Sequence, residues 1–245
     1  TTIEFESATN DPMAMLLTLG ITLLILNPSV NSQFFILFFV KQLGMGAIAG
    51  IALGLLAGWI LKKITFQEVG LVPVFIMAVV LIAWLGGELL GGNRLLAAYI
   101  IGITLGNQEF SGKENTLHFF NSISWLSQAV MFLLLGLQIF LGELIKLLGQ
   151  SVLPAIFLIL VARPVSVFLC MLFNRASLKK KIFISWVGLK GATPIVFAFV
   201  PVLQGVDKAN EIFNMVFFVV VISILIQGTT IGQFARYLKL EDKEN

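Results

Sequence analysis

The chain has 245 residues, of which 58% are hydrophobic and only 12% are charged, and its formal net charge is +3. A soluble domain of this size carries about twice that share of charged residues. The composition therefore predicts an all-α polytopic membrane protein and argues against a nucleic-acid-binding surface. The single cysteine, Cys170, and the single histidine, His118, exclude an internal disulfide and a zinc site.

Cys170 lies in an apolar run and is expected to be a small core residue, whereas His118 is expected in a polar loop. No motif in the chain predicts an enzyme, a cofactor or a resident metal ion. The bilayer and a transported ion are the partners that the composition favours.

Eight apolar segments are expected to cross the membrane, because a helix needs roughly 20 residues to span a bilayer. They are 3–26, 34–61, 70–87, 93–107, 120–141, 151–173, 182–203 and 211–233. Turns are expected at 27–29, between the flanking glycine pairs 86–87 and 91–92, and at 204–207. Residues 1–236 are thus predicted to form one transmembrane domain, with a cytoplasmic tail at 237–245. Lysines and arginines concentrate on alternate connections, which predicts that both ends are cytoplasmic.

The first segment begins with a polar stretch, residues 6–12 (Glu-Ser-Ala-Thr-Asn-Asp-Pro), that precedes an apolar run. The run from Met13 to Leu26 is too short to cross a bilayer on its own. The segment is long enough to cross the bilayer only if it includes the polar stretch. Asp11 then lies at membrane depth, where an ionisable group indicates a functional site. The alternative is an N-cap, since Asn or Asp followed by proline often opens a helix.

Helical spacing would gather oxygen atoms on one side of this segment. Ser7 and Asp11 are four residues apart and share a face, while Glu6 and Asn10 share the neighbouring face. Pro12 has no N–H, so the carbonyl four residues before it loses its usual partner. A hydroxyl, a carboxylate and a carbonyl are hard oxygen ligands, and the pattern predicts a site for an alkali cation.

The second segment carries a glycine at every fourth position: Gly46, Gly50, Gly54 and Gly58. Glycines at this spacing form a smooth face on which the backbone of another helix can approach closely. Packing against a helix of the same protomer is favoured over packing at a dimer seam.

Two later segments carry basic residues at membrane depth. The sixth holds Arg163 before a proline, and an arginine cannot lose its charge there. The seventh is interrupted around Lys190 by two glycines, a threonine and a proline: Gly188, Gly191, Thr193 and Pro194. Such an interruption indicates a broken helix at a transport site. In the alternative interpretation, Lys190 lies near an interface and extends toward the membrane surface.

Few acidic residues can balance these cations. Asp207 and Asp242 lie outside the predicted spans, which leaves Glu6 and Asp11 as intramembrane acids. The simplest arrangement pairs Glu6 with Lys190 or Arg163, and leaves Asp11 to exchange a cation against protons.

Four motifs spread over the chain carry a resemblance to a known family. They are Glu-Ser-x-x-Asn-Asp-Pro at 6–12, Trp-Leu-Ser-Gln-Ala-Val-Met-Phe at 125–132, Val-Ala-Arg-Pro at 161–164 and Trp-x-Gly-Leu-Lys-Gly-Ala-x-Pro at 186–194. Together they resemble the monovalent cation–proton antiporters of the sodium/hydrogen exchanger type. Among these, the sequence is most similar to the bacterial cell-volume-regulation potassium/proton branch.

The resemblance implies an inverted-repeat fold in the inner (plasma) membrane, alternating access, exchange of K⁺ or Na⁺ for H⁺, and a homodimer in the full-length form. It makes Asp11 the carboxylate that binds the cation or the proton, with Asn10 and Ser7 as supporting ligands. It pairs Glu6 with the basic residue at Lys190 and adds Arg163 as a second structural cation.

Two departures from the family pattern accompany the resemblance. Lys190 stands where the family commonly has arginine, and a lysine can release its proton when it is buried. The chain is also expected to correspond to the C-terminal part of an antiporter, without the upstream helices that would complete the inverted repeat.

Three other functions compete with the antiporter. A cation channel would need a repeated filter or a ring of carbonyls or carboxylates, which the sequence does not offer. An intramembrane aspartyl protease needs two close carboxylates that share a proton, whereas Glu6 and Asp11 point to different faces. An inactive truncated fragment is the third alternative.

Overall fold

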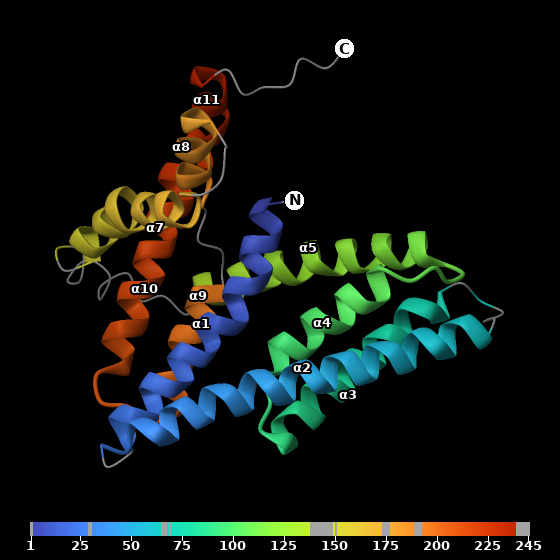
Figure 1. The fold of residues 1–245 in the computed structure, drawn as a ribbon. Helices are drawn as coiled ribbons and strands as arrows, with labels where there is room; N and C mark the ends of the chain where they lie inside the picture. The colour runs from blue at the N-terminus through green and yellow to red at the C-terminus, as the bar shows by residue number, and fades with distance from the viewer. Residues whose placement is uncertain are drawn as a thin grey trace. The chain divides into compact units, whose positions relative to one another are not determined.

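The structure, a computed structural model, describes residues 2–28, 31–64, 68, 70–137, 149, 151–172, 177–188 and 193–238, with the backbone alone for residues 2–9, 32, 88 and 135. These residues are helical apart from short turns (Figure 1). They belong to two compact units, Thr1–Leu133 and Leu134–Asn245, and each unit is described by itself.

The first helix, α1, runs from Thr2 to Leu26 and contains the polar stretch in its interior. Asp11 is its tenth residue and Pro12 its eleventh, so the proline does not open the helix and the N-cap alternative is wrong. At 1.5 Å per residue, the 25 residues of α1 extend about 38 Å, more than the hydrocarbon core of a bilayer. The prediction that the polar stretch and the apolar run form one helix is confirmed.

Helices α2 (Ser32–Lys63), α3 (Leu71–Leu90) and α4 (Arg94–Gly106) pack together in the first unit (Figure 1). Their shared core consists of small and branched apolar side chains: Ala57, Leu61, Val72, Ile76, Val79, Ala83, Ala97, Ile101 and Leu105. The predicted span at 93–107 is helical, but the 13 residues of α4 extend only about 20 Å and cannot cross a bilayer alone.

The glycine face of α2 packs against α4. A Cβ added at Gly46 would lie 2.8 Å from the Asn93 carbonyl oxygen, and one at Gly50 would lie 2.8 Å from the Ala97 carbonyl oxygen. A Cβ at Gly54 would lie 2.9 Å from the Cβ of Thr104, and one at Gly58 would meet the side chain of Gln108. The prediction that this face packs within the protomer is confirmed.

The boundaries of α3 and of α5 (Lys113–Leu137) differ from those predicted. The helix α3 continues to Leu90, so the turn predicted between the glycine pairs 86–87 and 91–92 is wrong, and the chain turns at Gly91, whose φ is +69°. The helix α5 begins before the predicted start at residue 120, because the Gly112 carbonyl accepts the first helical bond from the Thr116 N–H. His118 therefore lies in a helix and not in the predicted loop.

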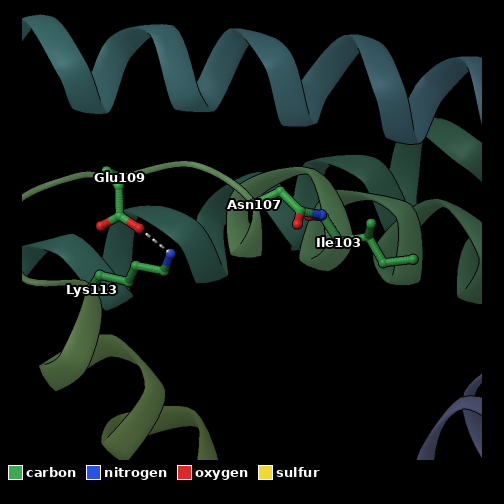
Figure 2. A network of polar contacts seen from close by, with 4 residues as sticks. All are labelled: Ile103, Asn107, Glu109 and Lys113. Carbon is green, nitrogen blue, oxygen red and sulfur yellow. Dashed lines mark hydrogen bonds and ion pairs between the residues drawn. The ribbon is translucent and has the colours of Figure 1, made fainter. Parts of the chain in front are cut away.

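Two side-chain contacts fix the connection from α4 to α5, as Figure 2 shows. The Asn107 amide donates to the Ile103 carbonyl at the end of α4, with the nitrogen 2.8 Å from the oxygen. Lys113 forms an ion pair with Glu109, with 3.1 Å between the nitrogen and the oxygen. The Glu109 side chain is 91% exposed, so this pair contributes little to stability.

The second unit contains a helix over Ser151–Cys170, whose last part consists of a π-helical turn η1 (Leu158–Ala162) and α7 (Arg163–Cys170). It is followed by α8 (Leu178–Val187), α9 (Thr193–Leu203), and a continuous run of α10 (Ala209–Ser223), π-helical η2 (Ile224–Gly228) and α11 (Thr229–Tyr237). Helices α9 and α10 share an apolar core: Ile195, Ala198, Phe213, Phe217 and Val220. The predicted seventh segment is thus two helices, and the predicted turn at 204–207 is confirmed.

Cys170, the last residue of α7, is exposed and not in the core. An apolar run in the sequence does not distinguish a helix face that packs against protein from one that faces outward, which is why the prediction was wrong. Among the described residues, four helices are long and apolar enough to cross a membrane: Gln33–Lys63, Lys113–Leu134, Ser151–Cys170 and Ala209–Tyr237.

Candidate functional site

The carboxylate of the predicted ion site lies in the interior of α1. Asp11 is half-buried, Asn10 is exposed, and Pro12 is buried. The backbone of Glu6 and Ser7 is helical and continues the same helix, while their side chains lie outside the described residues. The structure therefore places Asp11 and Asn10 within α1, and the roles of Asp11, Asn10, Ser7 and Glu6 in an ion site stay predictions.

A buried asparagine of another helix holds the backbone beside Asp11. The side-chain nitrogen of Asn93 donates to the Pro12 carbonyl over 2.9 Å, and Asn93 is only 3% exposed. Its side-chain oxygen accepts from the Leu96 N–H over 2.9 Å and so caps the N-terminus of α4. Its backbone N–H donates to the Gln42 carbonyl of α2 over 2.8 Å. One residue thus links α1, α2 and α4 at the predicted ion site.

A cavity of about 180 Å³ lies beside this junction. Its wall combines apolar Met15 and Leu19 of α1 with three polar residues: Gln42, Asn93 and Arg94. The guanidinium of Arg94 also lies over the ring of Trp84, 5.0 Å from its centroid. The cavity therefore brings polar groups of α2 and α4 close to the part of α1 that follows Asp11.

In the second unit, the structure brings together Arg163 and Gly188. Gly188 follows the last residue of α8, and a Cβ at this position would collide with the guanidinium of Arg163. The backbone of Gly188 has φ −63° and ψ 59°, which other residues can adopt, so the conformation does not require glycine, and a larger residue here would require the Arg163 guanidinium to shift. Two residues that the sequence singled out in separate segments thus meet where α8 ends.

The π-helical turn before Arg163 has a local cause. Pro164 has no N–H to give to the preceding turn, and its ring collides with the backbone of a regular helix. The wider turn η1 accommodates the proline, and the Arg163 N–H donates to the Leu158 carbonyl five residues earlier. The Val-Ala-Arg-Pro motif therefore marks the place where the helix changes from π-helical to α-helical geometry, and Arg163 is the first residue after the change.

A second buried amide, which the sequence analysis missed, holds the end of α8. The Gln227 side chain is 1% exposed, donates to the Trp186 carbonyl over 3.0 Å and accepts from the Ser223 hydroxyl over 2.5 Å. The Trp186 ring N–H donates to the Thr230 hydroxyl over 3.0 Å, and its ring stacks on Phe234. Because the last carbonyls of a helix have no partner within it, Gln227 satisfies one of them. A polar residue inside the apolar run of the eighth segment was the signal that could have found it.

The other side of the interruption begins with Thr193 and Pro194. They are the first two residues of α9, where a proline loses no helical hydrogen bond, so Pro194 opens this helix. Lys190 and Gly191 lie outside the described residues, and the predicted pairing of Glu6 with Lys190 stays a prediction. Asp11 and Arg163 belong to different units.

Replacing Gln227 by leucine should lower the free energy of unfolding by about 1–3 kcal/mol, because it removes the hydrogen bond that this buried amide donates to the part-buried Trp186 carbonyl. Thermal unfolding of the purified protein measures the effect. The control is Gln204→Leu, the same replacement at an exposed glutamine in the turn after α9, for which we expect little change. Equal melting temperatures for the two variants would contradict the role of Gln227.

An acidic residue inside an apolar helix, together with a second apolar segment broken in two, is an arrangement typical of ion-coupled membrane transporters. The comparison with known proteins identifies the family. The transmembrane sodium/hydrogen exchanger family model matches residues 1–237, and the chain belongs to this family. The predicted membership is confirmed.

Two relatives have similar coverage. The chain is 38% identical over 246 residues to the K(+)/H(+) antiporter NhaP2 of Shewanella baltica (strain OS223), and 34% identical over 240 residues to the K(+)/H(+) antiporter NhaP of Alkalimonas amylolytica. Each alignment covers 98% of this chain and 42% of the relative, so the chain spans less than half the length of these proteins. The Na(+)/H(+) antiporter NhaG of Bacillus atrophaeus is 26% identical over 213 residues, covering 84% of this chain and 40% of NhaG.

A solved structure shows the same fold. The sodium proton antiporter MjNhaP1 of Methanocaldococcus jannaschii, at pH 8, matches with a TM-score of 0.82 and 24% identity, over 97% of this chain and 63% of that one. The predicted all-α antiporter fold is therefore confirmed.

Proposed function

We propose that the protein exchanges a monovalent cation, K⁺ or Na⁺, for H⁺ across the membrane by alternating access at Asp11. The single observation that carries the proposal is the position of Asp11 in the interior of the 25-residue helix α1, where its apolar part begins, in a chain of the sodium/hydrogen exchanger family. Burying an ionisable group at membrane depth costs free energy, and such a residue therefore indicates a functional site.

The mechanism follows from competition for one carboxylate. Asp11 binds either a proton or a cation, and each neutralises its charge, so only the occupied site crosses the low-dielectric interior readily. Asn10 and Ser7 supply neutral oxygen atoms to the cation, while Glu6 is paired with Lys190 or Arg163 and does not compete for it. In the second unit, α8 and α9 form the two parts of the broken helix, and Arg163 lies against Gly188 where α8 ends.

The names of the relatives favour potassium as the first cation to test. The two relatives at 38% and 34% identity are named as K(+)/H(+) antiporters, whereas NhaG, at 26%, is named as a Na(+)/H(+) antiporter. We further propose that the protein works as a homodimer in the plasma membrane, with both ends of this chain in the cytoplasm.

The test is proton flux in vesicles that contain the protein as its own cells produce it. A pH difference is imposed across the membrane, and K⁺ or Na⁺ is then added outside. We expect the pH difference to collapse at a rate that saturates with cation concentration, and we expect the cation KM to rise as the pH falls because protons occupy the same carboxylate. A rate that does not saturate, together with single-channel current steps, would instead identify a channel.

A further inference from the structure

We propose that Asn93 is a positioning residue for the ion site, which sets the affinity for the cation by holding the backbone beside Asp11. The inference rests on the proposed exchange at Asp11. It extends the site from the polar stretch of α1 to a residue that lies 81 positions later in the chain.

Contacts with α2 and α4 fix the orientation of the Asn93 side chain independently of its bond to α1. Its oxygen accepts from the Leu96 N–H and its backbone N–H donates to the Gln42 carbonyl, so both its position and the direction of its amide are determined. With the oxygen occupied by an N–H donor, the amide nitrogen must face the Pro12 carbonyl. A carbonyl has two lone pairs, so Pro12 can accept this bond in addition to one within its own helix.

The bond acts on Asp11 through a nearly rigid connection. Between the Pro12 carbonyl and the Cα of Asp11 lie three backbone torsions: the planar peptide bond, φ of Pro12 and ψ of Pro12. The peptide bond does not rotate, and the proline ring fixes φ near −65°. Only one soft torsion, ψ of Pro12, therefore separates the carbonyl that Asn93 holds from the Cα of Asp11, and ψ of Asp11 then sets the direction of the side chain that carries the carboxylate.

The two ions depend differently on this positioning. A proton needs one carboxylate oxygen, whereas an alkali cation needs several oxygen ligands at defined distances at the same time. Releasing the backbone beside Asp11 should therefore weaken cation binding more than proton binding. A purely structural role for Asn93 would instead lower the amount of folded protein and leave the affinities unchanged.

Asn93→Ser separates the two roles of the residue. Serine caps a helix about as well as asparagine does, but its side chain is too short to reach the Pro12 carbonyl. The matched control is Asn107→Ser at the other end of α4, which also removes an asparagine bond to a backbone carbonyl, here that of Ile103 in the same helix (Figure 2). Both variants are made in the protein as its own cells produce it.

We expect Asn93→Ser to raise the KM for K⁺ about three- to tenfold, the equivalent of one hydrogen bond, with kcat per folded protein within about twofold of the original. The proton concentration for half-maximal rate should change less than the cation KM, and Asn107→Ser should change neither. A second measurement without transport is the rise in melting temperature on adding K⁺, which should shrink in Asn93→Ser alone.

Equal cation KM values and equal K⁺-dependent melting shifts for Asn93→Ser and Asn107→Ser would overturn the inference. If Asn93→Ser does not fold, Asn93→Asp takes its place, because aspartate keeps the cap and loses the N–H donor. Failure of the underlying function is a different result: the original protein would then show no cation-dependent proton flux at all.

Discussion

Vesicles that contain the Asp11→Asn variant should show no cation-dependent proton flux above that of protein-free vesicles. The amide has nearly the same size as the carboxylate, so it fits the half-buried position in α1. It cannot take up or release a proton near neutral pH and carries no charge to bind a cation. Both halves of the exchange therefore disappear in one substitution, whereas the loss of a supporting ligand would only change the affinity.

Two controls make this test specific. Asp207→Asn is the same replacement at an exposed aspartate in the turn before α10, and it should leave the flux unchanged. Asp11→Glu keeps the carboxylate on a side chain one methylene longer, and should retain measurable flux with a raised cation KM. Flux retained in Asp11→Asn, with normal amounts of folded protein, would rule out Asp11 as the exchanging group.

Two glycines of α2 should respond to the same substitution with opposite signs. A Cβ at Gly50 would lie 2.8 Å from the Ala97 carbonyl oxygen, a backbone atom that cannot rotate away, so Gly50→Ala forces α2 and α4 apart. Overpacking of this kind lowers the free energy of unfolding by about 1–3 kcal/mol. Gly50→Leu should be worse and should prevent the isolation of folded protein.

Gly44 provides the matched control, because it lies in the same helix and has no atom within 4 Å of an added Cβ. Gly44→Ala should raise the free energy of unfolding by up to about 1 kcal/mol, because alanine favours a helix over glycine. Thermal unfolding in one detergent compares the two variants directly. A Gly50→Ala variant as stable as Gly44→Ala would show that α2 and α4 do not pack along this face.

Features that depart locally from an apolar background could be predicted from the sequence. The polar stretch around Asp11, the glycines of α2 and the interruption after Gly188 are of this kind, and the structure places each of them in or at the end of a helix. The C-terminal end of α3 could not be predicted in this way, because the glycines at 86–87 also depart from the apolar background and yet lie inside the helix. Two glycines in a helix destabilise it by only about 1 kcal/mol each, and packing in the bundle outweighs that amount.

The partners of Asn93 and Gln227 could not be predicted because they lie far away in the sequence. Asn93 reads locally as an ordinary helix cap, and its bond to the Pro12 carbonyl spans 81 positions of the chain. Gln227 reads as one polar residue in a long apolar segment, and the Trp186 carbonyl that it satisfies is 41 positions away. Hydrophobic periodicity carries no information about such pairs, and the π-helical turn η2 that contains Gln227 leaves no separate signal in it.

The exposed thiol of Cys170 at the end of α7 can report whether this helix end lies in water or in the lipid bilayer. Cys170 is the sole cysteine of these 245 residues, so within this chain a reagent that alkylates thiols has one target. The reactive form is the thiolate, which hardly exists in hydrocarbon. The alkylation rate of Cys170 therefore distinguishes a helix end that meets water from one that meets lipid. A change in that rate on adding K⁺ would reveal a movement of the helix that carries Arg163.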